Sequence, residues 1–337
     1  AILAQAVAPR APGRLLSPIP GSRPASTPRR GRAHCGVTMA APHFLVFGGN
    51  GWIGGQLCDE LSKQGISYTK AKARAENVEG VAAELDSVRP THVISFLGRT
   101  HGTTDDGRTI GTIDYLEEKG KIKENVRDNL FSPMVLAMLS QARGIHFTYL
   151  GTGCIFEFDK DHPFETAYTG QGFTEESKPN FFASSYSTVK GFTDQLMHLF
   201  DKDVLNLRIR MPITGFHNHR NFITKICKYE YVCSIANSMT VLDELLPVMV
   251  KMALNRESGT FNMTNPGVIS HNEILTMYKE IVDPDFTWKN FSEEEMLKIL
   301  ASGRSNNRLE TTKLTSKYPV DDIKTAVRKA LGTMSKL

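Results

Sequence analysis

The sequence predicts an α/β protein with a doubly wound parallel sheet, and three observations lead to this fold class. Short apolar segments alternate with longer segments of helical periodicity, at 43–47, 92–96, 146–150 and 204–208. A glycine-rich turn directly follows the first apolar segment, and Arg89-Pro90 marks the turn before the segment at 92–96. Strands that alternate with helices form parallel sheets with helices on both faces. We expect a smaller α/β lobe to follow at the C-terminal end.

Length and composition are those of an ordinary globular protein. The 337 residues are 40% hydrophobic and 23% charged, enough for one large domain or two small ones. The net charge is +4, but six arginines precede the first acidic residue, and removing these six positive charges from +4 leaves −2. The basic balance therefore predicts no nucleic-acid partner. No apolar run reaches the ~18 residues that a membrane span needs, so no membrane partner is expected.

The five cysteines are scattered and form no C-x-x-C pair. An odd, dispersed set indicates a reducing compartment rather than a disulfide framework, and we expect a cytoplasmic protein. Residues 1–38 are rich in Arg, Pro, Ala, Ser and Gly and contain no acidic residue, so they lack the apolar surface to fold. They are either an organelle-targeting segment or a disordered tail ending near residue 40. The prolines, and Met39 just before the first strand, favour a tail.

The first apolar segment runs into the string Gly48-Gly49-Asn50-Gly51-Trp52-Ile53-Gly54-Gly55. Strand, glycine turn and amphipathic helix are the context of a loop that binds the pyrophosphate of a dinucleotide. Gly48 would permit the tight turn, Gly51 the approach of the backbone to the pyrophosphate, and Gly54 close packing of the helix. A plain structural turn is the alternative. The sequence thus predicts a Rossmann-type domain over 41–212, with cofactor contacts from Gly48, Asn50, Gly51, Trp52, Ile53 and Gly54.

The segment after the second expected strand, 67–69, indicates which dinucleotide binds. An acidic residue about 20 positions beyond the glycines accepts hydrogen bonds from the ribose of NAD, whereas a basic residue meets the phosphate of NADP. Lys70, Lys72 and Arg74 stand here, with Glu76 just beyond. We therefore expect NADPH, with Arg74 as a phosphate-binding residue and NADH as the alternative cofactor. A solvated basic loop is the other interpretation.

Tyr186 and Lys190 lie four residues apart in a helical segment, so their side chains share one face. A nearby ammonium lowers the pKa of a phenol, which can then exchange a proton with a carbonyl or carbinol oxygen near neutral pH. The pair suits hydride-transfer chemistry, although an exposed helical pair is the simpler interpretation of the motif alone.

Thr152 and Cys154 follow the strand expected at 146–150, at the edge of a parallel sheet where ligands bind. The Thr152 hydroxyl could hydrogen-bond the same oxygen as Tyr186. Cys154 could carry acid–base chemistry or be a small buried hydrophobe.

Further elements are expected along the rest of the chain: helices at 78–88, near 122–142, at 222–228 and at 241–255, and a strand at 259–263. The polar segment 99–122 is expected beside the active site rather than in the core.

Ser270 and Ser292 each precede a glutamate by three residues, the form of a capping box that starts a helix. The smaller lobe is expected over 213–337 and closes over a cleft. Arg304 lies there in a breaker-rich loop, where its guanidinium could clamp a diphosphate or be an ordinary surface arginine.

The glycine turn, the strand-end threonine and the Tyr-x-x-x-Lys pair, in this order, resemble an extended short-chain dehydrogenase/reductase. Longer strings resemble the UDP-4-keto-6-deoxyglucose 3,5-epimerase/4-reductases, the nucleotide-rhamnose synthase/epimerase-reductase family related to dTDP-4-dehydrorhamnose reductase. These strings are Gly151-Thr152-Gly153-Cys154-Ile155-Phe156, Pro179-Asn180-Phe181, Arg208-Ile209-Arg210-Met211-Pro212-Ile213, Asn221-Phe222-Ile223-Thr224-Lys225, Asn237-Ser238-Met239-Thr240, Thr264-Asn265-Pro266-Gly267 and Arg304-Ser305-Asn306-Asn307. The resemblance covers residues 43–325, and segment 99–122 departs from the plant pattern.

The resemblance implies a bifunctional enzyme that inverts C3 and C5 of a 4-keto-6-deoxy nucleotide sugar and reduces its C4 ketone with NADPH. It implies that Cys154 and Lys225 are the acid and base of the inversions, with the assignment to C3 or C5 open. Tyr186 would protonate the C4 oxygen, Lys190 would lower its pKa and bind the nicotinamide ribose, and Thr152 would orient the carbonyl. Met211 would contact the cofactor, and three residues would bind the nucleotide sugar: Asn180, Asn221 and Arg304. No metal is implied, and a homodimer is possible because dimers are common in the superfamily.

Two alternatives stay open. One is a reductase that acts on an already epimerised dTDP sugar, which would leave Cys154 and Lys225 without a role. The other is a non-catalytic, nucleotide-binding regulatory subunit of the same fold, against which the presence of Thr152, Tyr186 and Lys190 argues.

Overall fold

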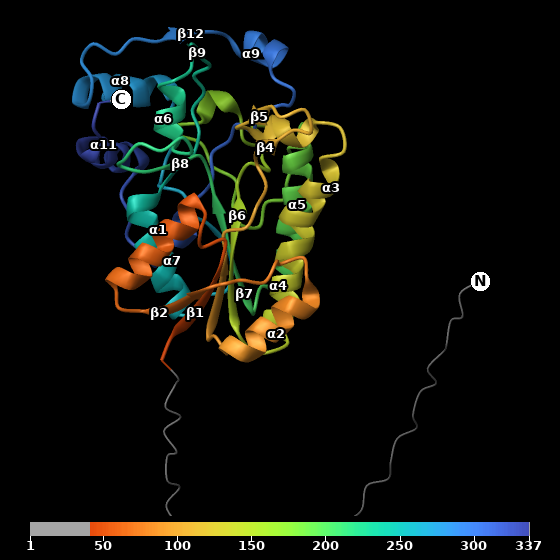
Figure 1. Cartoon of the computed structure of the whole chain (residues 1–337). Helices are drawn as coiled ribbons and strands as arrows, with labels where there is room; N and C mark the ends of the chain where they lie inside the picture. Colours follow the sequence, from red (N-terminus) through yellow and green to blue (C-terminus); the bar gives the residue numbers. More distant parts are fainter. Residues whose placement is uncertain (1–40, 337) are drawn as a thin grey trace, which may run out of the picture. The chain divides into compact units, whose positions relative to one another are not determined.

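The computed structural model describes residues 41–336, so the expectations for residues 1–38, and Cys35 with them, lie outside the described residues. Six parallel strands form the main sheet in the order β2-β1-β3-β6-β7-β11 (Figure 1). Their bounds are β1 His43–Phe47, β2 Ser67–Lys70, β3 His92–Ser95, β6 His146–Thr152, β7 Val204–Ile209 and β11 Gly259–Asn262. The expected α/β class with a parallel sheet is confirmed.

Helices cover both faces of this sheet because successive strand residues point to opposite sides. One face packs against α1 Trp52–Lys63, α7 Leu242–Leu254 and α10 Thr312–Thr315. The other packs against α2 Val78–Val88, α4 Ser132–Gln141 and α5 Ser185–Met197. Val46 enters the first core and its neighbour Leu45 the second. No helix within 41–336 is long and apolar enough to cross a bilayer.

The winding of the sheet changes direction between β1 and β3. β1 pairs with β2 on one side and with β3 on the other, and β6 and β7 continue beyond β3. In open α/β sheets, ligands bind at such a switch point, outside the carboxyl ends of the strands. Gly48 and Thr152 both lie at this edge of the sheet.

The single helix expected near 122–142 is interrupted by a π-helical turn, which corrects that expectation. The run consists of α3 Ile122–Val126, η2 Arg127–Phe131 and α4. Pro133 explains the break because it has no N–H to donate to the Asn129 carbonyl, four residues earlier. That carbonyl instead accepts a hydrogen bond from Thr193 Oγ1 at 2.6 Å. The turn therefore ties this helical run to α5.

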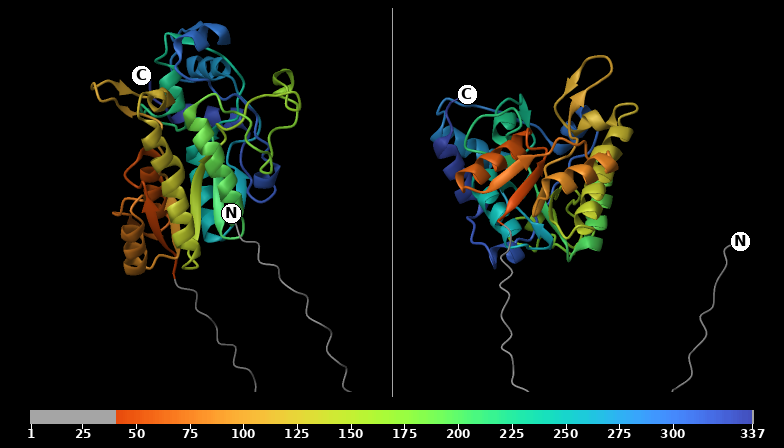
Figure 2. Two further views of the ribbon diagram at one scale, coloured as in Figure 1. Left: turned by 90° about the vertical axis from the view of Figure 1, so that its right-hand side faces the viewer. Right: turned by 60° about the horizontal axis from the view of Figure 1, so that its bottom comes forward.

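The segment 99–122 contains a small hairpin and a 3₁₀ turn. The hairpin pairs β4 Gly102–Thr103 with β5 Thr109–Ile110 and projects from the body of the molecule (Figure 2). The 3₁₀ turn η1, Ile113–Glu117, buries Tyr115 and Leu116 against Tyr186. The expectation that this segment stays out of the core is therefore wrong for these two apolar residues, whose burial removes hydrophobic surface from water.

The chain after residue 212 builds a second hydrophobic cluster at the carboxyl ends of the strands (Figure 1). The cluster draws on β8 Pro212–Ile213, α6 Phe222–Ile226, β9 Tyr231–Val232, β10 Thr240–Val241, α8 His271–Ile281 and α11 Ile323–Thr333. Two exposed elements of this part of the chain stay outside it, β12 Lys289–Asn290 and α9 Glu293–Ile299. Both expected capping boxes are present, at Ser270 and Ser292. α7 and β11 follow residue 212 in the sequence but pack with the main sheet. The domain boundary expected at residue 212 therefore stays a prediction.

Candidate active site

The glycine turn lies at the carboxyl end of β1. Gly48 has a φ of +76°, which side-chain-bearing residues rarely adopt, and its carbonyl accepts a hydrogen bond from the Gly51 N–H at 2.9 Å. A Cβ built at Gly54 would lie 2.3 Å from the Gly48 oxygen, so α1 can begin this close to the turn only with glycine there. The N-terminus of α1 therefore faces a tight backbone loop, as a pyrophosphate-binding turn requires.

Three other residues of this turn were expected to contact the cofactor. Asn50 is exposed, whereas Trp52 and Ile53 are half-buried in the first turn of α1. The Trp52 Nε1 atom is buried and has no hydrogen-bond partner among the described residues.

Lys70, rather than Arg74, approaches the glycine turn. Lys70 Nζ donates a hydrogen bond to Asn50 Oδ1 at 3.3 Å, from the end of β2. Arg74 is exposed, and its Nε lies 3.2 Å from Glu76 Oε1. Lys70 is thus the cation that contacts the glycine turn, while the role expected of Arg74 stays a prediction.

Tyr186 is buried in the first turn of α5, beside the end of β6. Two side chains cap the N-terminus of this helix. Ser184 Oγ accepts a hydrogen bond from the Ser187 N–H at 3.1 Å, and Glu117 Oε1 accepts one from the Ser185 N–H at 2.7 Å. Tyr186 shares a hydrogen bond with the Thr152 side chain and packs against Cys154. The Thr152 hydroxyl also accepts from the Cys154 N–H at 3.1 Å.

The structure therefore brings Tyr186, Thr152 and Cys154 together, as their positions in the sequence predicted. Together they place a phenol, a hydroxyl and a thiol in one largely buried cluster.

Lys190 is buried one turn further along α5 and meets a different phenol. Its Nζ donates a hydrogen bond to the Tyr149 hydroxyl and lies 4.6 Å from the centre of the Tyr149 ring. Burial lowers the pKa of Lys190 to about 8, against the opposing effects of Asp194 and Cys154. The Lys190 ammonium thus contacts the Tyr149 phenol, and the Tyr-x-x-x-Lys motif did not reveal this contact.

Burial also raises the pKa of Tyr186, with a further increase from Cys154 and a smaller, opposing effect of the hydrogen bond with Thr152. The sequence argument expected Lys190 to lower this pKa. In the described arrangement desolvation dominates instead, because the phenol is buried and the ammonium is directed at Tyr149.

Asp194 anchors the same face of α5 one turn below Lys190. It forms a buried, bidentate ion pair with Arg208, at 2.9 Å from Nε to Oδ1 and 2.7 Å from Nη2 to Oδ2. Asn206 Nδ2 donates to the same carboxylate at 2.9 Å. The sequence did hold a signal for this pair, since an arginine inside a buried strand is rarely left unpaired.

Lys225 lies on α6 among other basic groups. Burial, followed by the nearby Arg220, lowers the pKa of Lys225. Arg220 Nη2 donates to His101 Nε2 at 2.7 Å, and burial with these cations lowers the pKa of His101 to about 4. Cys154 interacts with a different set of groups, on α5 and at the end of β7. Cys154 and Lys225 therefore have different neighbours, and their roles as acid and base stay predictions.

The residues expected to bind the nucleotide sugar all have partners within the protein. The Asn180 amide joins both backbone groups of Glu157, accepting from its N–H at 2.9 Å and donating to its carbonyl at 3.0 Å. Asn221 caps α6 and is fully buried, donating to the Thr214 carbonyl at 2.9 Å. Arg304 pairs with Asp114 of η1. Their roles toward substrate stay predictions.

Met211, expected to contact the cofactor, has a strained backbone. Its φ is +39°, although a residue before proline prefers extended backbone. Such a conformation costs roughly 1–3 kcal/mol and occurs most often at ligand sites. The preceding residue is fixed by Thr240, whose N–H donates to the Arg210 carbonyl at 2.8 Å and whose hydroxyl accepts from the Arg210 N–H at 3.0 Å.

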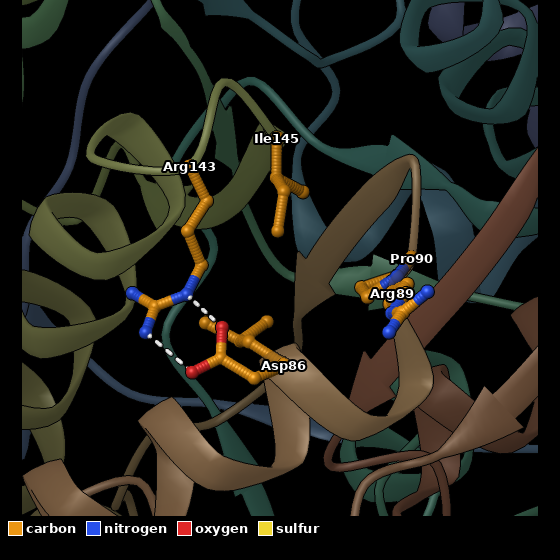
Figure 3. A pocket seen from close by; sticks show the side chains of 6 residues that line it. Asp86, Arg89, Pro90, Arg143 and Ile145 are labelled. Atoms are coloured by element: carbon orange, nitrogen blue, oxygen red, sulfur yellow. Dashed lines mark hydrogen bonds and ion pairs between the residues drawn. The ribbon is translucent and has the colours of Figure 1, made fainter.

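A surface hollow at the other edge of the sheet is separate from this site. Its lining residues lie around the starts of β3 and β6: Leu85, Asp86, Arg89, Pro90, Arg143 and Ile145 (Figure 3). Arg143 donates to the Asp86 carboxylate there at 2.7 and 3.1 Å. The hollow is thus at the opposite ends of the strands from Gly48 and Thr152.

Solved structures share this fold. No family model matches the chain. The dTDP-4-dehydrorhamnose reductase of Bacillus anthracis, solved in complex with NADP, superposes with a TM-score of 0.69 at 16% identity, over 86% of this chain and 98% of that one. Fold and the Tyr186–Lys190 pair together define an extended short-chain dehydrogenase/reductase.

Two relatives are far more similar in sequence. A UDP-rhamnose synthase from Acanthamoeba polyphaga mimivirus is 52% identical, with a TM-score of 0.82 over 87% of this chain and 100% of that one. A bifunctional dTDP-4-dehydrorhamnose 3,5-epimerase/dTDP-4-dehydrorhamnose reductase from Arabidopsis thaliana is 43% identical over 285 residues, covering 84% of this chain and 90% of that protein. The chain belongs to this family of bifunctional epimerase/reductases, which confirms the resemblance seen in its motifs.

Proposed function

We propose that this protein converts UDP-4-keto-6-deoxyglucose to UDP-L-rhamnose, by inversion at C3 and C5 and NADPH-dependent reduction at C4. The observation that carries the proposal is the cluster of Tyr186, Thr152 and Cys154 at the carboxyl end of β6. It combines a proton donor for the C4 oxygen with a thiol that can act on the neighbouring carbons. The names of the mimivirus and plant relatives support the same pair of activities.

The residues at the end of β1 fit a nicotinamide dinucleotide. The glycine turn leaves no room for a Cβ at Gly54, the buried Trp52 Nε1 lacks a partner among the described residues, and Lys70 stands beside the turn. NADPH, when bound, supplies a hydride for C4. We propose that Lys70 and Arg74 favour NADPH over NADH, because a positive charge beside the ribose binds the additional phosphate.

In the proposed epimerisation, a base removes the proton next to the ketone and an acid returns one on the opposite face of the ring. Cys154 serves one face and Lys225 the other. Burial, followed by the nearby Arg220, lowers the pKa of Lys225 and so makes its ammonium a stronger acid.

In the proposed reduction, Tyr186 donates its proton to the C4 oxygen, and the Thr152 hydroxyl orients that oxygen. Lys190 holds a positive charge within the buried cluster, one helical turn from Tyr186. Asp194 fixes the helix below it through Arg208. We further propose a cytoplasmic location, a nucleotide sugar as the substrate, and a homodimer as the assembly to test.

The direct test incubates the protein with UDP-4-keto-6-deoxyglucose and NADPH. We expect UDP-rhamnose by NMR, with one NADPH oxidised for each sugar, and no oxidation by Tyr186→Phe. A parallel incubation with the dTDP-linked sugar tests the choice of base. Bound NADPH without oxidation would support a regulatory subunit, whereas oxidation only with the epimerised 4-keto-rhamnose nucleotide would support a reductase alone.

A further inference from the structure

Arg220 carries a positive charge that no carboxylate balances. It lies in the loop before α6, and its Nη2 donates to His101 Nε2 at 2.7 Å. Within residues 41–336, this is the only hydrogen bond or ion pair of the Arg220 guanidinium. Arg304, by contrast, is paired with Asp114. The charge of Arg220 is therefore left for a bound anion.

His101 holds the Arg220 guanidinium in place without cancelling its charge. A guanidinium only donates, so His101 Nε2 accepts and the ring proton is on Nδ1, which lies 3.1 Å from Thr100 Oγ1. Burial, followed by Arg220 and other nearby cations, lowers the pKa of His101 to about 4, so the imidazole is neutral at pH 7. A neutral acceptor orients the arginine, whereas a carboxylate would also offset its charge.

Lys225 is a second cation beside Arg220 without a carboxylate partner. Its N–H donates to the Asn221 carbonyl at 3.0 Å, which places Lys225 one helical turn beyond the residue that follows Arg220. The Lys225 ammonium has no hydrogen bond or ion pair among the described residues. Arg220 and Lys225 thus put two unbalanced positive charges at the start of α6.

The remaining cations near His101 do not share this excess. Arg99 is balanced by two carboxylates, with its Nε 2.9 Å from Asp128 Oδ2 and 3.8 Å from Glu124 Oε2. His219 is exposed to solvent. The place for an anion is therefore beside Arg220 and Lys225.

We propose that Arg220 binds the sugar-side phosphate of the nucleotide diphosphate, the phosphate bonded to the sugar, and holds the substrate together with Arg304. The inference rests on the proposed function, in which Lys225 acts on the sugar ring. The sugar-side phosphate is the one nearest to that ring, and Arg220 is the cation beside Lys225. The N–H groups of Arg220 that His101 leaves free can donate to phosphate oxygens. Because His101 already orients the guanidinium, less conformational freedom is lost on binding.

Calorimetric titration of the full chain with UDP and with UMP, at saturating NADPH, tests this assignment. UDP carries the sugar-side phosphate and UMP lacks it. We expect Arg220→Gln to weaken UDP binding at least about tenfold and UMP binding less than about twofold, because a charge-assisted contact with that phosphate is lost. Arg220→Lys keeps the charge without the fork and should bind UDP with intermediate affinity. Arg143→Gln removes an arginine at the opposite edge of the sheet and should bind both nucleotides normally.

Two variants of His101 test the charge of Arg220 without altering Arg220 itself. His101→Gln keeps a neutral acceptor, whereas His101→Glu places a carboxylate of similar size beside the guanidinium. We expect His101→Glu to bind UDP about tenfold more weakly than His101→Gln, because the carboxylate competes with the phosphate. Urea midpoints show that the variants are folded, and equal UDP affinities of the two would overturn the proposal.

The Arg220 variants have their own contrary outcomes. An unchanged UDP affinity in folded Arg220→Gln, or an equal loss for UDP and UMP, would overturn the assignment. A loss of NADPH affinity with UDP affinity kept would overturn it as well, since the phosphate would then belong to the cofactor. If Arg220→Gln does not fold, the two His101 variants decide the question.

Nucleotide binding requires no turnover, so this inference and the proposed function can fail separately. A protein that binds UDP through Arg220 but forms no UDP-rhamnose would contradict the proposed function alone. UDP-rhamnose formation with an unchanged KM in Arg220→Gln would overturn the inference alone.

Discussion

Asp114 and Arg304 lie 190 residues apart and are joined by two contacts, 3.2 Å from Nη1 to Oδ1 and 2.5 Å from Nη2 to Oδ2. The Ser302 hydroxyl donates to the same carboxylate at 3.0 Å. The neighbouring Tyr115 packs against Tyr186. Segment 99–122 therefore links the buried tyrosine to the arginine expected to hold the nucleotide diphosphate.

Replacing Asp114 by asparagine removes the charge that orients Arg304. We expect the KM for the nucleotide sugar to rise about tenfold, because an arginine without its partner loses more conformational freedom on binding. Steady-state kinetics measure this effect, and the affinity for NADPH should not change. Ser302→Ala, which removes a weaker contact, is the matched control. A lower KM in Asp114→Asn would show instead that Asp114 competes with the diphosphate.

Removal of the Cys154 thiol should separate the two proposed reactions. We expect Cys154→Ala to lose solvent deuterium exchange at C3 or C5 while it still binds NADPH and still reduces an already epimerised substrate. Its loss of exchange should be at least about 100-fold, the usual contribution of a general acid or base. Cys227 lies at the C-terminal end of α6, and Cys227→Ala serves as the control, because it removes a thiol at another place in the protein. Unchanged exchange would leave Cys154 without its proposed role.

Lys190 should affect activity and stability in opposite directions as the pH rises. Its folded pKa is lowered to about 8, while an unfolded lysine has a pKa near ~10.4. Between these values the unfolded chain holds a proton that the folded protein has released, so the contribution of Lys190 to stability increases with pH. The reduction rate should fall over the same range, because the ammonium loses its charge.

Urea unfolding of the unaltered protein and Lys190→Met, compared from pH 7 to 10.5, isolates the stability effect. The difference between their unfolding free energies should change across this range and level off above it. A constant difference would show that the pKa of Lys190 is not lowered in the folded state.

Two neighbouring glycines test the turn at the end of β1. A Cβ at Gly54 would lie 2.3 Å from the Gly48 oxygen, whereas one at Gly55 would lie 3.9 Å from the Gly49 oxygen, an ordinary contact. Gly54→Ala should therefore weaken NADPH binding at least about tenfold, or about 1.4 kcal/mol. Gly55→Ala should bind normally. Fluorescence titration with NADPH measures both, and equal affinities would remove the proposed role of the turn's close packing.

Two bidentate Asp–Arg pairs differ mainly in burial and should differ in their effect on stability. Asp194 and Arg208 are 4% and 0% exposed, so Asp194→Asn leaves a buried charge unbalanced and should cost about 3–5 kcal/mol of unfolding free energy. The Asp86–Arg143 pair lies on the surface, where Asp86→Asn should have no measurable effect. Urea denaturation measures both variants, and equal losses would contradict the role of burial.

The six strands of the main sheet and α2 could be predicted from the sequence because their signals are local. A strand buried on both faces leaves an uninterrupted apolar run. α2 begins after Asn77, whose side chain accepts from the Gly80 N–H at 3.0 Å, and it ends at Val88, which Arg89 and a proline follow. The π-helical turn could not be predicted, because the Thr193 hydroxyl that satisfies the Asn129 carbonyl comes from a helix 64 residues away.

The same distinction applies to the candidate site. The Tyr186–Lys190 pair and the glycine turn depend on spacing along one helix or one loop, so the sequence reveals them. Their partners come from tertiary packing: Tyr149 lies 41 residues from Lys190, and Asp114 lies 190 from Arg304. The direction of the Lys190 ammonium, and with it the pKa of Tyr186, was therefore beyond a sequence argument.

The π-helical turn at Arg127–Phe131 determines how the preceding helix is oriented about its own axis. An α-helix rotates by about 100° per residue, so deleting one residue from this turn would restore regular spacing and rotate α3 by that angle. Asn125 would then lose its contact with the Ser185 hydroxyl, now 3.3 Å away. A one-residue deletion here would thus keep the helix and misalign the start of α5, whereas the projecting β4–β5 hairpin can change in length without that consequence.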